Sequence, residues 1–378
     1  MPADTLSPLQ RLSALGQSVW LDFLSRDSIR GGHLQELIDD YAVVGATSNP
    51  TIFQTAMTAG DAYAAQIHEL AAQGKDVQET FWALAEQDIM DACDLFRPVW
   101  DGGGGRDGYV SLEVDPRLAY DTLATFREAI ALHESVERPN LMVKIPATRP
   151  GLAAIEDVVA KGRSINVTLI FSLRRYAEVA ESYIRGIERL VAEGGDPRRV
   201  ASVASFFVSR IDTETDRRLD ELDRAGAGGV SVDELKGKLA VANAKLAYAH
   251  YLAAFAGPRW EFLRGKGATP QRVLWASTST KNPAYPDTLY VDELIGPDTV
   301  NTMPEQTLEA YQDHGDPRVR LEEDLDGARR VFAELERAGV DYDDVTDTLE
   351  REGVEKFSDS FAQLMSALAD KLQSPAPA

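Results

Sequence analysis

Residues 141–148 read LMVKIPAT, a short apolar stretch with one charged residue, Lys144, near its centre. An ammonium group is costly to bury unless it is paired or gives up its proton. A lysine that is desolvated without a partner has a lowered pKa, and its neutral amine can attack a carbonyl carbon to form a Schiff base. The simpler interpretation is a strand lysine whose head reaches water. This stretch alone favours the simpler interpretation, and the rest of the chain reverses that preference.

Further apolar runs of similar length alternate with longer amphipathic segments along the chain. The runs are typical of short buried strands, and the segments between them are typical of helices. The runs lie at residues 19–24, 42–47, 109–114, 164–171, 200–208, 272–277 and 288–291, and the helical segments at 61–97, 115–137, 172–193, 213–223 and 231–256. Eight strands separated by helices predict an α/β fold, a (β/α)8 TIM barrel, with a doubly wound open sheet as the alternative.

The length of 378 residues leaves room for additional helices, because such a barrel typically needs only ~250 residues. We expect residues 1–378 to form a single barrel domain, with residues 320–373 as a C-terminal helical extension packed on the barrel. In this extension, Phe357, Phe361 and Met365 recur every four residues. That spacing is typical of core packing rather than of a lid.

The composition limits the partners of the chain. Lys and Arg total 39 against 61 Asp and Glu, a net charge of −22, so nucleic acid and anionic membrane surfaces are disfavoured. A phosphorylated substrate would need a local cationic pocket. Cys93 is the only cysteine, which fits a reducing compartment. No apolar run approaches the ~20 residues of a membrane span, and the first residues lack a signal-peptide pattern, so we expect a cytoplasmic protein.

Polar residues interrupt the predicted strands, often toward their C-terminal ends. In a barrel enzyme that end holds the active site, so these side chains are expected to converge there. Capping of helices or turns would explain some of them, Asn49 in particular, but charged groups within three separate apolar runs favour convergence. The residues within runs are Asp22, Glu113, Lys144, Asn166, Thr168 and Ser205, and those just beyond them are Asn49, Arg210 and Lys281.

This set suits Schiff-base chemistry. A lysine amine would attack a ketone, while carboxylates and a hydroxyl would move protons, and the basic residues after the sixth and seventh runs would bind phosphate. A metal-dependent reaction is disfavoured, because the five histidines lie far apart and show no ligand spacing. We therefore expect no metal.

Five segments, in the same order as in that family, resemble the motifs of transaldolases. They read GATSNPTIF (45–53), VSLEVDPRLAYD (110–121), MVKIPAT (142–148), INVTLIFS (165–172) and SFFVSRID (205–212). The later segments LWASTSTKNP (274–283) and NTMP (301–304) are similar to the longer, bacterial type of transaldolase. The resemblance covers most of the chain.

The resemblance implies a class I Schiff-base aldolase barrel that uses no cofactor. Members of the family move a dihydroxyacetone unit from sedoheptulose 7-phosphate or fructose 6-phosphate to glyceraldehyde 3-phosphate or erythrose 4-phosphate, in the non-oxidative pentose phosphate pathway. By the same resemblance, Lys144 would form the Schiff base and Asp22 would handle the proton of the substrate hydroxyl at the bond that breaks. The remaining assignments are Glu113 and Thr168 to a catalytic water, Asn49, Asn166 and Ser205 to the dihydroxyacetone hydroxyls, and Arg210 to phosphate.

Two departures from the family pattern affect the expected phosphate site. Shorter members have an arginine after the seventh strand, whereas this chain has Ser279 and Lys281 in a longer segment, and lysine is a point charge without a bidentate fork. Phe206 stands where the family has a proline.

We expect sugar-phosphate substrates and a monomer or homodimer. Two other functions stay open: an aldolase that releases dihydroxyacetone to water, and a barrel that binds sugar phosphates without turnover.

Overall fold

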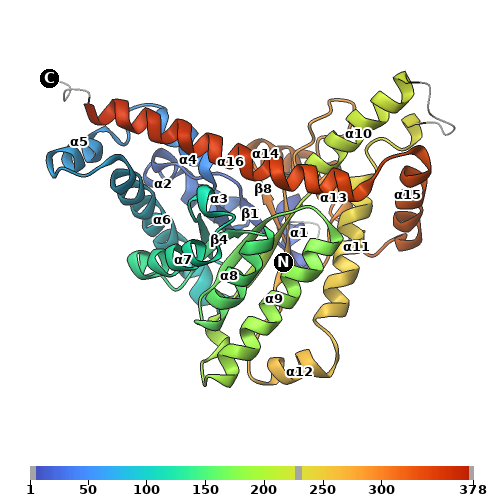
Figure 1. The fold of residues 1–378 in the computed structure, drawn as a ribbon, viewed down its shortest axis with the longest axis horizontal. Helices are drawn as coiled ribbons and strands as arrows, with labels where there is room; N and C mark the ends of the chain where they lie inside the picture. The colour runs from blue at the N-terminus through green and yellow to red at the C-terminus, as the bar shows by residue number, and fades with distance from the viewer. Residues whose placement is uncertain (1–5, 226–231, 374–378) are drawn as a thin grey trace.

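Eight parallel strands close into a barrel, and helices surround it (Figure 1). The computed structural model describes residues 6–225 and 232–373. β1 pairs with β8 as well as with β2, so the sheet has no open edge. The predicted (β/α)8 barrel is therefore confirmed, and the open-sheet alternative is wrong. The strands are β1 Gln17–Leu21, β2 Val43–Thr47, β3 Tyr109–Glu113, β4 Leu141–Pro146, β5 Ile165–Ile170, β6 Ser202–Phe207, β7 Arg272–Ala276 and β8 Thr299–Met303.

The helices lie outside the barrel and across its ends. They are α1 Pro8–Ala14, α2 Arg26–Arg30, α3 His33–Asp40, α4 Pro50–Thr58, α5 Ala64–Ala72, α6 Val77–Gly102, α7 Thr122–Val136, α8 Arg149–Ala160, α9 Leu173–Ala192, α10 Ser209–Arg224, α11 Leu239–Ala254, α12 Gly257–Gly265, α13 Leu289–Glu293, α14 Glu305–His314, α15 Leu325–Ala338 and α16 Tyr342–Gln373, with short 3-10 turns η2 Pro116–Leu118, η3 Pro197–Arg199 and η4 Val232–Glu234. The expected helix start at Ser231 and the first five residues fall outside the described residues.

The prediction of a strand at residues 288–291 is wrong. Residues 289–291 belong to α13, Thr288 is its N-cap, and Tyr290 anchors that helix because its hydroxyl donates to Asp212 Oδ2 at 2.9 Å. The eighth strand is β8, whose apolar pattern is interrupted by Asn301 and Thr302. Both side chains are buried and bonded inside the protein: Asn301 Oδ1 accepts from Thr278, and the Thr302 hydroxyl lies 2.8 Å from that of Thr47. Contacts between distant segments therefore compensate for the weak strand pattern.

Helix boundaries differ from the expected segments where a capping residue intervenes. The segment 61–97 forms two helices, because Gly74 takes a positive φ of 75° and Asp76 begins α6 with a capping box. Asp115 caps only the turn η2, and Asp121 caps α7. The segment 172–193 forms α9 as expected, with Ser172 as its N-cap.

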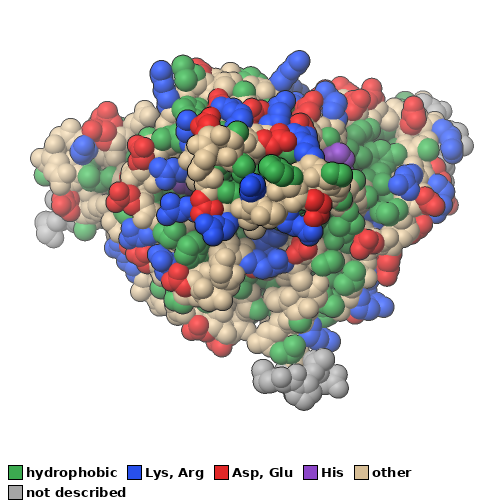
Figure 2. Space-filling view, turned by 90° about the horizontal axis from the view of Figure 1, so that it is seen from below, with side chains coloured by type: hydrophobic (Ala, Val, Ile, Leu, Met, Phe, Trp, Pro, Cys, Tyr) green, Lys and Arg blue, Asp and Glu red, His purple; other side chains and the backbone are tan. Residues whose placement is uncertain are grey.

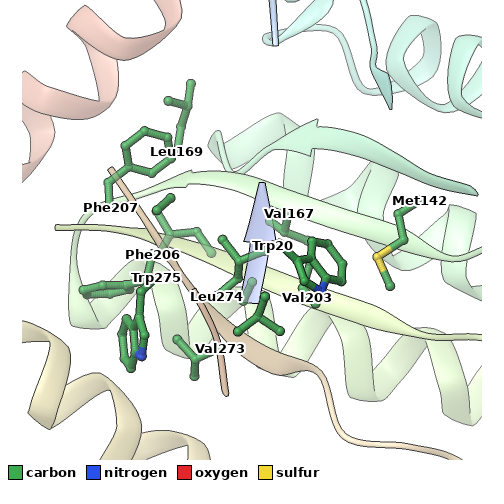
Figure 3. Packing of buried hydrophobic residues seen from close by; sticks show 14 of the residues in the cluster. Trp20, Met142, Val167, Leu169, Val203, Phe206, Phe207, Val273, Leu274 and Trp275 are labelled. Carbon is green, nitrogen blue, oxygen red and sulfur yellow. The ribbon is translucent and has the colours of Figure 1, made fainter. Parts of the chain in front are cut away.

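Trp20 fills the barrel interior at mid-height. Its side chain is fully buried and lies near Met142, Val203 and Leu274 (Figure 3). Gly45 on the neighbouring strand β2 makes room for it, since a Cβ there would lie 2.6 Å from the indole ring. A packed interior of this kind leaves the ends of the strands as the place for chemistry.

Helix α16 crosses the carboxyl end of the barrel, from the side of α10 to the side of α4 and α5 (Figure 1). Bonds hold it on both sides: Arg175 pairs with Glu350 at 3.2 Å, and the hydroxyls of Thr51 and Ser360 lie 2.9 Å apart. Lys371 Nζ donates to a carbonyl of α4 at 2.9 Å. The C-terminal helix is thus tied to the elements that frame the carboxyl ends of the strands.

The opposite end of the barrel is seen in Figure 2, where Lys and Arg side chains are interspersed with Asp and Glu. The net charge of −22 therefore does not produce a uniformly acidic surface. None of the helices in the described part of the chain is long and apolar enough to span a bilayer.

Candidate active site

Three of the predicted site residues lie side by side on consecutive strands. Glu113 on β3 is in register with Lys144 on β4, and Lys144 is in register with Asn166 on β5. All three are 5% exposed or less. The strand register thus brings a carboxylate, an ammonium and an amide to one level of the barrel.

Lys144 is buried but paired. Its Nζ donates to the backbone carbonyl of Ser48 at 3.1 Å and lies 3.4 Å from Glu113 Oε2. The ring of Phe357, on α16, covers the amine, with its centroid 5.8 Å from Nζ. The interpretation of a lysine whose head reaches water is therefore wrong. The nitrogen is held in place, and an apolar face shields it from solvent.

Glu113 and Thr168 are buried with hydrogen-bonding capacity to spare. Apart from the Lys144 ion pair, neither carboxylate oxygen of Glu113 has a hydrogen-bond partner among the described residues, and neither does Thr168 Oγ1. Burial raises the pKa of Glu113 to about 7; Lys144 opposes this shift and Asp22 adds to it. Buried polar groups are normally satisfied, so this pair is suited to hold a water or a substrate hydroxyl.

The backbone next to Thr168 is irregular. The pairing of β5 with β6 shifts between Val167 and Ile170, and Leu169 takes a positive φ of 59°. Bulges and left-handed residues of this kind occur next to active sites, where they re-aim a side chain. Helix α16 packs directly on this bulge at Gly353, where a Cβ would lie 3.0 Å from Leu169 Cδ2.

Asp22 immediately follows β1 and is partly exposed. Its Oδ1 accepts from the Thr47 hydroxyl at 2.8 Å, which orients the carboxylate. Burial raises the pKa of Asp22, and the charge of Lys144, the Thr47 bond and the charges of Arg210 and Lys281 lower it in part. Asp22 is therefore within electrostatic range of the buried lysine and of the two predicted phosphate-binding cations, and a carboxylate there can accept and return a proton.

Asn166 links three strands through its amide. Its Nδ2 donates to Ser111 Oγ at 3.0 Å, and its Oδ1 accepts from Ser205 Oγ at 2.7 Å. Asn166 and Ser205, predicted separately, are thus in direct contact beside Lys144. Ser111, which was not among the predicted site residues, is thus a partner of the amide.

Asn49 is the N-cap of α4. Its Oδ1 accepts from the backbone NH of Ile52 at 3.0 Å. The capping role considered from the sequence is therefore present. It engages the oxygen of the amide and does not require Nδ2, which leaves that donor for a ligand.

The predicted phosphate residues lie at the outer rim of this set. Arg210, in the first turn of α10, stacks over Phe207 with Cζ 5.3 Å from the ring centroid. Lys281 is exposed in the segment after β7 and donates to Ser279 Oγ at 2.5 Å. Burial lowers the pKa of the Arg210 guanidinium, and Asp22 and Glu352 oppose this shift.

The sequence reasoning missed contributions from the backbone and from α16. The acceptor for Lys144 at Ser48 is a backbone carbonyl, so the residue type at that position does not indicate it. Thr47, which orients Asp22, was not among the predicted site residues. Phe357 is 3% exposed, so it packs in the core as expected. Its ring lies over the amine of Lys144. No spacing within one helix could indicate that position.

Comparison with known proteins agrees with this geometry. A sequence model described as transaldolase/fructose-6-phosphate aldolase matches residues 19–368. The chain belongs to the transaldolase family. It is 54% identical over 370 residues to a transaldolase of Parafrankia sp., covering 98% of this chain and 99% of the relative.

Other members of the family match as fully. A transaldolase of Frankia alni is 52% identical over 367 residues, covering 97% of this chain and 98% of the relative. Transaldolase 1 of Streptomyces avermitilis is 51% identical over 374 residues, covering 98% and 97%. The family resemblance inferred from the motifs is confirmed. The matched span runs from β1 into α16, so it includes every predicted site residue as well as Phe357.

Proposed function

We propose that the residues at the carboxyl end of the barrel carry out the transaldolase reaction through a Schiff base on Lys144. The chain is a transaldolase, which transfers a dihydroxyacetone unit from a ketose phosphate to an aldose phosphate in the pentose phosphate pathway. One observation carries the assignment to Lys144. Its buried Nζ lies 3.4 Å from the carboxylate of Glu113, which is also buried and has no other hydrogen-bond partner among the described residues. The aromatic ring of Phe357 covers the amine.

The first half-reaction forms the covalent intermediate. The neutral amine of Lys144 attacks C2 of fructose 6-phosphate or sedoheptulose 7-phosphate, and the carbinolamine loses water to give an iminium ion. Glu113 supplies and removes the protons of these steps through a water held with Thr168. The raised pKa of Glu113, about 7, suits it to both directions near neutral pH.

The second step breaks the carbon–carbon bond. Asp22 takes the proton of the C4 hydroxyl, the C3–C4 bond breaks, and its electron pair moves toward the iminium to give an enamine. The shortened aldose phosphate leaves. With an acceptor aldehyde, the enamine carbon forms the new bond, Asp22 returns the proton to the alkoxide, and water releases the new ketose from Lys144.

The remaining residues hold the substrate. Asn166 and Ser205 lie beside the lysine and Asn49 caps α4, so we assign them to the hydroxyls of the dihydroxyacetone unit. Arg210, with Lys281 and Ser279, binds the phosphate at the rim. A ketose phosphate would then extend from the buried amine, past Asp22, to these cations.

Release of dihydroxyacetone to water is the alternative fate of the same enamine. The Phe357 ring over Lys144 favours transfer, because a covered intermediate persists until an acceptor arrives. We further propose that the enzyme works in the cytoplasm, since its one cysteine, Cys93, is a free buried thiol. We also propose that it acts as a monomer or homodimer.

Borohydride trapping tests the proposal. The enzyme is incubated with fructose 6-phosphate, reduced and mapped by peptide mass spectrometry. We expect a three-carbon adduct on Lys144 and none in Lys144→Met. An adduct on another lysine, or transfer activity that survives in Lys144→Met, would overturn the assignment. Binding of fructose 6-phosphate with no adduct on any lysine would favour a non-catalytic sugar-phosphate barrel.

A further inference from the structure

Helix α16 turns one face toward the residues of the proposed active site. Gly353 packs on Leu169, and Phe357, four residues later, lies over Lys144. Residues four apart lie on the same side of a helix, and Lys356, three residues after Gly353, adjoins that side. The helix is held here by the Thr51–Ser360 contact at 2.9 Å. Lys356 is therefore carried to the rim of the site by a helix anchored on both of its sides.

Lys356 interacts electrostatically with two other cations that come from different parts of the fold. Arg210 begins α10, Lys281 follows β7, and Lys356 belongs to α16. The positive charge of Arg210 and burial both lower the pKa of Lys356. The pKa of Lys281 is lowered by burial and by the positive charges of Arg210 and Lys356. Lys281 and Lys356 are thus each within electrostatic range of Arg210, and helix α16, which packs on α10, brings Lys356 to the end of the barrel where Arg210 begins α10.

Acidic residues do not fully compensate this cluster. Glu352 and Asp22 act on Arg210, and Asp22 also acts on Lys281. Lys356 itself has no ion pair or hydrogen bond within residues 6–225 and 232–373. Arginine and lysine side chains elsewhere in this chain are mostly paired with carboxylates, as expected at a net charge of −22. Cations kept together without matching carboxylates are suited to a bound anion.

We propose that Lys356 is a third phosphate-binding cation, supplied by the C-terminal helix to the rim formed by Arg210 and Lys281. This inference rests on the proposed function, since it assigns the phosphate of the same substrate. It also accounts for the lysine after β7. Arg210 alone offers a bidentate fork, and Lys281 and Lys356 together add two positive charges where an arginine after β7 would add one. A phosphate monoester carries a charge of about −1.5 to −2 near neutral pH, so a third cation at the rim is favourable.

The test compares Lys356→Gln with Lys356→Arg and with a matched control, Arg351→Gln. Arg351 lies on the same helix, pairs with Glu355 at 3.5 Å and is 56% exposed, so its removal changes the net charge equally without touching the rim. Inorganic phosphate is titrated into each variant by calorimetry. We expect Kd to rise about tenfold in Lys356→Gln, as for loss of one charged hydrogen bond, and to stay near the wild-type value in Lys356→Arg and Arg351→Gln.

Kinetics with two donors separate a phosphate role from a structural one. In Lys356→Gln, kcat/KM for fructose 6-phosphate should fall by about the same factor, while kcat/KM for unphosphorylated fructose should not change. Equal losses with both donors, or a phosphate Kd that matches that of Arg351→Gln, would overturn the proposal. A wild-type enzyme without turnover would refute the proposed function, and the phosphate titration would still decide the role of Lys356.

Discussion

The Nζ of Lys144 lies 3.4 Å from Oε2 of Glu113, and both side chains are buried on adjacent strands in register. A buried ion pair contributes little net stability, because desolvation of the two charges offsets their attraction. Its value here is chemical. It places a proton acceptor with a pKa of about 7 next to the amine that must lose a proton before it attacks.

The pH dependence of the reaction should report Glu113. Below pH 7 its carboxylate is protonated and cannot act as a base, so we expect kcat/KM to fall as the pH drops through about 7. Glu113→Gln should lose this acidic limb and be slower by a factor on the order of 10²–10⁴. The measurement is a profile of initial rates from pH 5 to 9. An acidic limb that survives in Glu113→Gln would assign it to Asp22, whose pKa is also raised by burial.

Asp22→Asn should slow bond cleavage much more than Schiff-base formation. The amide can still accept the Thr47 hydrogen bond but cannot take a proton, so we expect cleavage to fall by roughly 10²–10⁴. Rapid-quench trapping of the adduct and release of aldose phosphate are followed in one turnover. Thr47→Ser, which keeps the hydroxyl, is the matched control. Parallel losses of adduct formation and cleavage would contradict this role.

His133 should make the protein sensitive to acid. Burial lowers its pKa from the usual 6.5 to about 4, and its Nε2 lies 2.9 Å from the carbonyl of Ser164. The unfolded chain binds a proton at pH 4–6.5 that the folded chain does not, so stability falls as the pH drops through this window. The loss attributable to this residue is about 3 kcal/mol.

His133→Gln keeps a donor for the carbonyl and removes the titration. Urea unfolding at pH 7.5, 5.5 and 4.5 should therefore show a smaller acid loss in this variant than in the wild type. His68→Gln changes a partly exposed histidine on α5 and controls for the removal of an imidazole. An identical acid loss in the wild type and in His133→Gln would rule out His133 as the cause.

The sequence predicts the barrel and the positions of its polar residues because the strands are otherwise apolar. Glu113, Lys144 and Asn166 stand out for that reason, and all three lie within strands: Glu113 ends β3, Lys144 is in the second half of β4, and Asn166 is the second residue of β5. Their alignment in register could not be predicted, because it depends on how neighbouring strands pair. The same limit explains β8, whose buried polar residues look like loop residues until Thr47 and Thr278 are placed beside them.

The role of α16 could not be predicted from the sequence, for a related reason. An amphipathic helix shows which of its faces is buried but not what that face covers. Phe357 and Phe361 follow the same spacing and are both buried. Only the packing distinguishes them: Phe357 lies over Lys144, whereas Phe361 meets Phe81 in an edge-to-face contact at 5.1 Å.

This difference yields a prediction about water. Phe357→Ala should uncover the lysine, so that the enamine is hydrolysed and free dihydroxyacetone appears from fructose 6-phosphate without an acceptor. Phe361→Ala removes an equally buried ring from the same helix but not from above Lys144, and each variant should lose about 3–5 kcal/mol of stability. Dihydroxyacetone release per transfer event is measured in both. Equal release in the two variants would mean that the packing of α16 on the barrel as a whole, rather than the Phe357 ring, excludes water. Release confined to Phe357→Ala would make that ring the element that separates transfer from hydrolysis.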